Sequence, residues 1–120
     1  MKIAVTSTGK DIQSAVDPRF GRCAAFVVYD TETEQAEAVD NSQNLNAPQG
    51  AGIQSGQTVS DLGVQAVVTG HCGPKAFRVL KAAGIDVVVG AEGTVKEAIG
   101  RYLAGDLQTA DSPDVEGHWV

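Results

Sequence analysis

The chain has 120 residues, of which 42% are hydrophobic and 20% are charged, and its formal net charge is −6. This length favours a single domain, and the composition excludes a disordered or fibrous chain. No Lys or Arg occurs between Arg22 and Lys75, so the clustered cations that bind phosphate backbones are missing and nucleic acid is not an expected partner.

The sequence contains no signal-peptide pattern and no apolar run long enough to cross a bilayer, so we expect a cytoplasmic protein without a membrane partner. Cys23 and Cys72 are the two cysteines. Two cysteines without a short repeated spacing do not make a secreted disulfide framework, which agrees with a reducing compartment.

In the first half of the chain, the pattern predicts three strands and a loop. Residues 2–6 form a short β-type run, and residues 24–30 and 34–40 are typical of a hairpin with a turn at 30–33. Residues 41–51 are rich in Asn, Gln, Gly and Pro without periodicity, so we interpret them as a long loop of possible functional importance.

In the second half, helices alternate with apolar strands. Apolar spacing predicts helices at 53–62, 76–83 and 95–103, the third with a capping box formed by Thr94 and Glu97. Residues 64–69 and 85–89 are expected strands. Gly63, Gly84 and Gly105 supply the helix ends.

This order, three strands followed by helix, strand, helix, strand and helix, predicts an α/β fold with a mixed five-stranded sheet flanked by helices. We assign residues 1–105 to this single domain and expect 106–120 to be an acidic, flexible tail in which Trp119 could act as an anchor. Ligands of open α/β sheets bind at the carboxyl ends of parallel strands, where residues 7–10, 70–73 and 90–93 emerge.

The loop at 70–74 holds the strongest functional signal. His71 and Cys72 supply nitrogen and sulfur donors, although adjacent side chains tend to diverge, so one of them rather than both is expected to contact a ligand. Gly70 and Gly73 permit close backbone approach, and Pro74 suits the first position of a helix whose free amides attract anions. The alternative is an ordinary strand-to-helix turn with Cys72 buried.

A second candidate segment precedes the hairpin and consists of Arg19, Phe20, Gly21, Arg22 and Cys23. Arginine keeps its charge and is weakly hydrated, so such a loop can face an anion. The alternative is that an arginine pairs with a nearby acid, Phe20 packs in the core and Cys23 is simply buried.

The chain resembles the family of nitrogenase iron–molybdenum cofactor accessory and carrier proteins over nearly the whole domain. The segments that carry the resemblance are 19–23, 41–46, 70–74 and 94–98. The resemblance implies a ribonuclease-H-like fold and non-enzymatic carriage of a preformed anionic metal–sulfur cluster. The implied cargo is a molybdenum–copper sulfide cluster or, alternatively, an iron–molybdenum–sulfur precursor.

The resemblance also implies which residues form the site. The cofactor-binding candidates are Arg19, Phe20, Gly21, Arg22, Cys23, Asn44, Gly70, His71, Cys72, Gly73 and Pro74, and the candidates for direct metal ligation are His71, Cys72 and Cys23. A cluster donor or acceptor protein and an ATPase are the expected protein partners.

Two other functional classes stay open at this stage. One is a regulatory interaction module that senses cluster or redox state and signals to an ATPase. The other is phosphate-directed catalysis, but strand 2–6 lacks the carboxylates that hold divalent metals in such enzymes. A simple zinc site is a further alternative, for which Cys23, His71, Cys72 and His118 lack the usual paired spacing.

Overall fold

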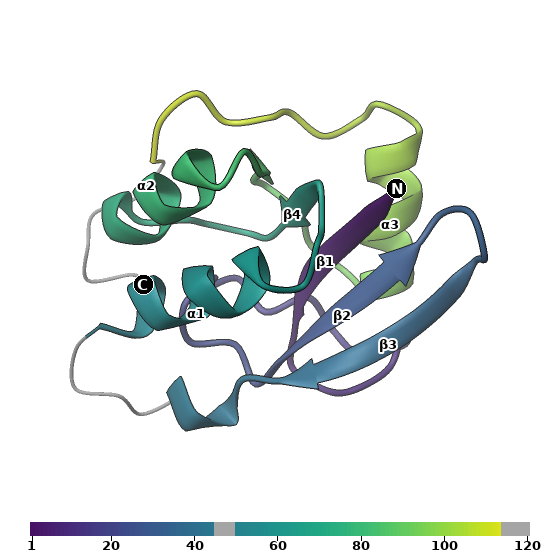
Figure 1. Ribbon diagram of the computed structural model, residues 1–120. Coiled ribbons are helices and arrows are strands. Elements are labelled where there is room, and N and C mark those ends of the chain that lie inside the picture. Colours follow the sequence, from purple (N-terminus) through teal and green to yellow (C-terminus); the bar gives the residue numbers. More distant parts are fainter. Residues whose placement is uncertain (45–49, 114–120) are drawn as a thin grey trace.

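The computed structural model describes residues 1–44 and 50–113 (Figure 1). Its elements are β1 (Lys2–Ser7), β2 (Ala25–Asp30), β3 (Gln35–Asp40), the short 3₁₀ helix η1 (Ser42–Asn44), α1 (Ala51–Ser60), β4 (Ala66–Val68), α2 (Pro74–Ala82), β5 (Asp86–Val88) and α3 (Val95–Leu103).

The predicted order of strands and helices is confirmed, and the differences concern their ends. The helix predicted at 53–62 begins and ends two residues earlier, and the strand predicted at 64–69 shortens to Ala66–Val68. Part of the predicted loop forms η1. Residues 45–49 of that loop, and 114–120 of the predicted tail with Trp119 and His118, lie outside the described residues.

The five strands form one mixed sheet in the order β3-β2-β1-β4-β5. β2 is antiparallel to both of its neighbours, whereas β1, β4 and β5 run parallel to one another. The predicted fold class, a mixed five-stranded α/β sheet flanked by helices, is therefore confirmed.

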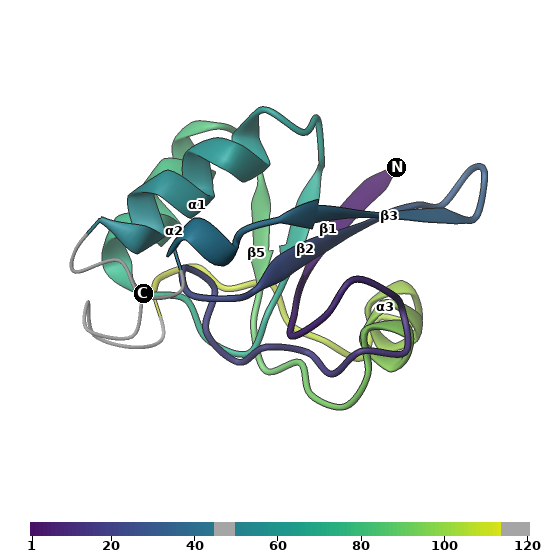
Figure 2. The same cartoon turned by 90° about the horizontal axis from the view of Figure 1, so that it is seen from below.

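The helices cover both faces of the sheet, as Figure 2 shows, with α1 and α2 on one face and α3 on the other. Alternation along β1 explains this division, because successive side chains of a strand point to opposite faces. Ala4 belongs to the core beneath α1 and α2, and Ile3 and Val5 belong to the core beneath α3. None of the helices in the described ranges is long and apolar enough to cross a membrane.

The amino ends of α1 and α2 lie at the same edge of the sheet. Each helix precedes a strand that runs parallel to β1, so each must return the chain from the carboxyl edge of the parallel strands to the opposite edge. The loops that follow β1 and β4 leave the sheet at this carboxyl edge, and the predicted site residues gather there.

Residues 106–113 of the predicted tail make contacts with the domain. The amide of Ala110 donates to the carbonyl oxygen of Val87 at 2.7 Å, Thr109 forms a bridge with Val88, and Leu107 packs against the core beneath α3. The division of the chain at residue 105 stays a prediction, but the sheet edge at β5 is covered by residues beyond it.

Candidate functional site

The two segments singled out in the sequence lie side by side at the carboxyl edge. The amide of His71 donates to the carbonyl oxygen of Pro18 at 2.8 Å, and the amide of Phe20 donates to the carbonyl oxygen of His71 at 3.3 Å. These bonds place Arg19 opposite His71 in a short parallel bridge. The structure thus joins residues that are 52 positions apart in the sequence.

The bridge between Arg19 and His71 determines to which side the neighbouring side chains point. Because extended backbone alternates its side chains, Arg19 and His71 face one side of the pair, and Phe20 and Cys72 face the other. Phe20 and Cys72 are completely buried in the core beneath α1 and α2, whereas Arg19 and His71 are partly exposed. His71 and Cys72 therefore diverge, as expected from their adjacency.

Gly70 makes the close approach of the two segments possible. A Cβ atom at this position would lie 2.8 Å from the Cα atom of Pro18 and 3.0 Å from its carbonyl oxygen. The carbonyl oxygen of Gly70 also accepts from the amide of Gly90 at 2.9 Å. The Pro18 backbone leaves no room for a side chain, so glycine is required here for proximity.

Arg19 is partly neutralised by a buried acid. Asp17 is 7% exposed, and its Oδ1 atom accepts from the Arg19 amide at 3.0 Å and lies 3.8 Å from the Arg19 Nε atom. The pairing of an arginine with a nearby acid, weighed as an alternative, is thus present. The Arg19 side chain nevertheless remains 43% exposed, so its guanidinium can also meet a ligand from outside.

Cys23 is completely buried and holds its proton. Burial, reinforced by the nearby Asp17 carboxylate, raises the pKa of the Cys23 thiol from 9.0 to about 12, although a hydrogen bond from Asn41 opposes the shift. Metals bind the thiolate rather than the thiol. In this conformation Cys23 is a core side chain, as is Phe20, and their predicted contact with a cluster stays a prediction that burial weighs against.

A buried polar cluster joins Cys23 to the predicted loop and to α1. Asn41 donates through Nδ2 to the Cys23 carbonyl oxygen at 3.0 Å and to Ser55 Oγ at 3.1 Å, and Asn44 donates to Asn41 Oδ1 at 2.9 Å. Ser55 in turn donates to the carbonyl oxygen of Gly21 at 2.9 Å. Asn44 is 1% exposed, and its Oδ1 atom has no hydrogen-bond partner among the residues that the structure describes.

Asn41 and Ser55 were not among the residues predicted for the site. A signal for Ser55 exists in the sequence, since Ser55 and Val59 are four residues apart and share the buried face of one helix. A polar side chain at a core position of a helix needs a partner, which points to a buried network. Asn41 follows a strand in a polar stretch, and no comparable signal distinguishes it from its neighbours.

The amino end of α2 completes the site. Gly73 is the N-cap residue, no side chain of the described residues caps the helix, and Pro74 occupies the start of the helix as predicted. Such an end leaves backbone amides without partners inside the helix and carries about half a positive charge. Across residues 1–44 and 50–113, no group of three or more His, Cys, Asp or Glu side chains could hold a metal ion.

The charges and donors of the site suit an anion. Arg19 and His71 are bridge partners beside the amide-rich end of α2, both cysteine sulfur atoms are buried, and Arg22 is partly exposed in the loop after Phe20. A bare metal ion would need several exposed donors, whereas an anion needs positive charge and hydrogen-bond donors.

Comparisons with known proteins agree in fold and sequence. The family described as dinitrogenase iron-molybdenum cofactor matches residues 1–105. An uncharacterised protein of Methanocaldococcus jannaschii is 32% identical over 96 residues, which cover 78% of this chain and 80% of the relative.

Two solved structures are similar over almost their whole length. The apo form of the orange protein from Desulfovibrio gigas is 45% identical, with a TM-score of 0.92 over 95% of this chain and 96% of that one. A Thermotoga protein of the DUF35 family is 36% identical, with a TM-score of 0.84 over 97% and 98% of the two chains.

Proposed function

The chain belongs to the dinitrogenase iron-molybdenum cofactor family, and on that basis we propose that it binds and carries a preformed anionic metal–sulfur cluster without transforming it. The cargo is of the molybdenum–copper sulfide type or of the iron–molybdenum type. In such a cluster the sulfides already satisfy the metals, so the protein has to supply positive charge, hydrogen-bond donors and a fitting surface. The orange protein is a similar chain whose structure is known in an apo form.

One observation supports this proposal most directly: Arg19 and His71 face the same side of one backbone pair beside the amino end of α2. The dipole of a helix end contributes only about 0.3–1 kcal/mol to binding an exposed anion. That amount is too small to retain a cargo, so the cationic side chains and several amides must act together.

The buried sulfurs support an electrostatic mode of binding. Cys23 and Cys72 are both fully buried, and the high pKa of Cys23 keeps that thiol neutral. Held in this way, the cluster can leave without the breaking of a metal–thiolate bond, which is the property that a carrier needs.

Reconstitution with tetrathiomolybdate and copper tests the proposal. Metal content and the absorption spectrum are measured for the wild type, Arg19→Gln, His71→Asn and Cys23→Ala. We expect the first two substitutions to weaken cluster binding by about tenfold, because each replaces a donor that reaches the charged cluster with a shorter amide. Cys23→Ala should bind like the wild type.

Lys96→Gln is the matched control, because Lys96 is an exposed cation on α3, on the opposite face of the sheet. Binding that is unchanged in Arg19→Gln and His71→Asn would contradict the proposed site. Protein purified from its native host that is colourless and metal-free, and that takes up no cluster, would contradict the function itself.

A further inference from the structure

A shallow groove of about 290 Å³ runs between α1 and α2 on the outer surface of the domain. Its apolar residues are Ile53, which is 37% exposed, Val79 and Ala82, and its charged residues are Lys75 and Arg78. Pockets that enclose a drug-sized ligand measure roughly 300–1,000 Å³. The groove therefore suits a few side chains of a larger partner better than a whole small molecule.

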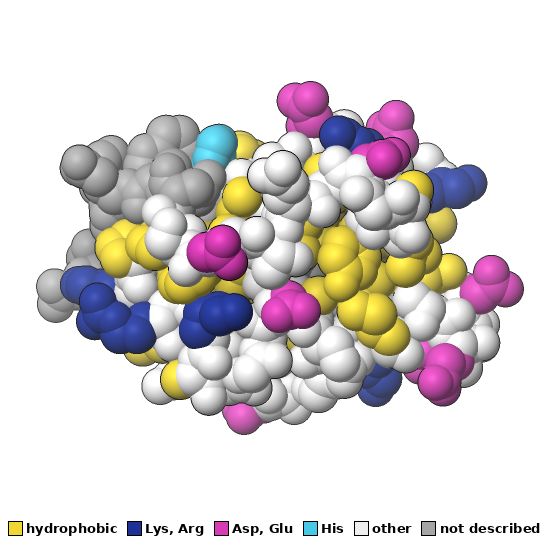
Figure 3. All heavy atoms as spheres, turned by 90° about the horizontal axis from the view of Figure 1, so that it is seen from above, with side chains coloured by type: hydrophobic (Ala, Val, Ile, Leu, Met, Phe, Trp, Pro, Cys, Tyr) yellow, Lys and Arg dark blue, Asp and Glu magenta, His cyan; other side chains and the backbone are white. Residues whose placement is uncertain are grey.

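The charge around this groove is opposite to that of the whole chain. The net charge is −6, yet α2 carries Lys75, Arg78 and Lys81 and no acid, and α1 has no charged residue. Figure 3 shows Lys and Arg side chains beside hydrophobic ones on the left of the molecule. Neither Lys75 nor Arg78 forms an ion pair with any part of the chain that the structure describes.

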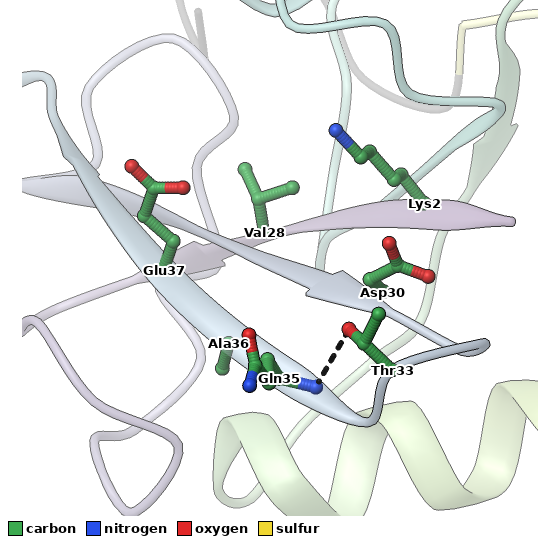
Figure 4. A pocket seen from close by; sticks show the side chains of 7 residues that line it. All are labelled: Lys2, Val28, Asp30, Thr33, Gln35, Ala36 and Glu37. Carbon is green, nitrogen blue, oxygen red and sulfur yellow. Dashed lines mark hydrogen bonds between the residues drawn. The ribbon is translucent and has the colours of Figure 1, made fainter.

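A second hollow differs in its charges. It lies over the hairpin end of the sheet, where Lys2, Asp30 and Glu37 line it together with uncharged residues (Figure 4). Both signs of charge are present there, so this hollow has no preference for a charged partner. The groove between α1 and α2 combines an apolar floor with a single sign of charge.

We propose that the groove between α1 and α2 docks an acidic amphipathic helix of a partner protein. Apolar side chains of that helix would lie on Ile53 and Val79, and its carboxylates would meet Lys75 and Arg78, in the helix-in-groove mode of recognition. Complementary charge of this kind selects the partner and speeds its association.

The position of the groove assigns the partner a role. Lys75 follows Pro74 directly, and Ile53 lies in the first turn of α1, so the groove begins at the edge of the proposed cluster site. The partner is then the protein that delivers the cluster or receives it. This assignment rests on the proposed function, whereas docking of an acidic helix does not depend on the cluster.

The experiment uses the full chain and a synthetic 18-residue helical peptide with a leucine stripe flanked by glutamates. Fluorescence polarisation of the labelled peptide measures binding at two salt concentrations. A second peptide carries lysine in place of every glutamate. The variants are Arg78→Glu and, as the matched control, Arg101→Glu, which reverses an exposed arginine on α3.

We expect the glutamate peptide to bind, the lysine peptide to bind at least about tenfold more weakly, and high salt to reduce the affinity. Arg78→Glu should lower the affinity about fivefold, the upper end of the range for a single exposed ion pair, and Arg101→Glu should leave it unchanged. Ile53→Ala should also weaken binding, because it removes apolar surface from the groove floor.

Three outcomes would overturn the proposal: equal binding of the two peptides, equal losses in Arg78→Glu and Arg101→Glu, or displacement of the peptide by vesicles of anionic phospholipid. The last would identify the groove as a membrane contact. Reconstitution of Arg78→Glu with tetrathiomolybdate and copper is measured in parallel. A variant that takes up the cluster normally but fails to bind the peptide separates docking from cargo binding.

Discussion

Gly70 is the residue on which the geometry of the site depends most closely. It holds the strand-to-helix loop against Pro18, and the approach is closer than any side chain permits. The contact is made by backbone on both segments, so neither segment can yield by rotating a side chain. The relative position of Arg19 and His71 follows from this contact.

Gly70→Ala should therefore lower the free energy of unfolding by about 1–3 kcal/mol, the usual cost of inserting atoms into packed structure. Urea unfolding monitored by circular dichroism measures this change. Gly100→Ala on α3 is the matched control, since a Cβ atom there would meet no atom of the described residues within 4 Å beyond the helix's own backbone. That substitution should raise stability by up to about 1 kcal/mol, because alanine favours helix.

The raised pKa of Cys23 predicts that the protein loses stability at high pH. Its pKa is about 12 in the folded chain and 9.0 ordinarily, so above pH 9 the unfolded chain releases a proton that the folded chain retains. The stabilising contribution is complete below the unfolded pKa and declines as the pH rises toward the folded one.

Between about pH 8 and about pH 10.5, the wild type should lose ~2 kcal/mol more unfolding free energy than Cys23→Ala, which has no thiol to titrate. Urea unfolding of both proteins across this range measures the difference. Parallel curves for the two proteins would show that Cys23 ionises in the folded chain as easily as in the unfolded one.

At the scale of elements, α3 is the helix whose start the sequence predicts most clearly. The capping box is present as predicted: Thr94 Oγ1 accepts from the Glu97 amide at 3.1 Å, and Glu97 Oε1 accepts from the Thr94 amide at 2.9 Å. Hydrogen bonding to Thr94, chiefly to its backbone amide, also lowers the pKa of the Glu97 carboxyl.

Thr94→Ala should cost about 1 kcal/mol of unfolding free energy, because it removes the oxygen that caps the helix. Chemical unfolding gives the value. Thr58→Ala on α1 is the control, since the Thr58 hydroxyl donates to the Gln54 carbonyl oxygen within its own helix and alanine there should be neutral or stabilising. A Thr94→Ala protein as stable as the wild type would show that packing alone holds α3.

The elements could be predicted from local patterns, but the site could be predicted only in part. Periodicity and capping identified the helices because these signals act over a few residues. The bridge between Arg19 and His71, by contrast, depends on backbone atoms of distant segments and on the space beside Gly70. The burial of Cys23 and Phe20 is likewise a property of the packed core and is not visible in their neighbours.

At the scale of the molecule, the family match ends at residue 105 while the packed structure continues. The bond from Ala110 to Val87 and the packing of Leu107 cover the β5 edge of the sheet. Open strand edges invite pairing with other chains. The segment beyond α3 thus protects the sheet, a role that its acidic composition did not indicate.

A chain that ends at residue 105 should be less stable than one that ends at 113, by about 1–3 kcal/mol for the lost burial of Leu107 and its neighbours. It should also self-associate through the uncovered edge of β5. Chemical unfolding and analytical ultracentrifugation of the two chains measure both effects. Equal stability and equal sedimentation would mean that residues 106–113 contribute nothing to the domain.

Under the proposed function, the burial of both thiols also bears on which ligands the site admits. Free copper(I) and mercury ions bind exposed thiols, and in this conformation both cysteines are buried. The empty protein would then select a cluster by its charge and shape rather than by the metals it contains. Metal sulfides of different metals but similar shape would compete for the same site.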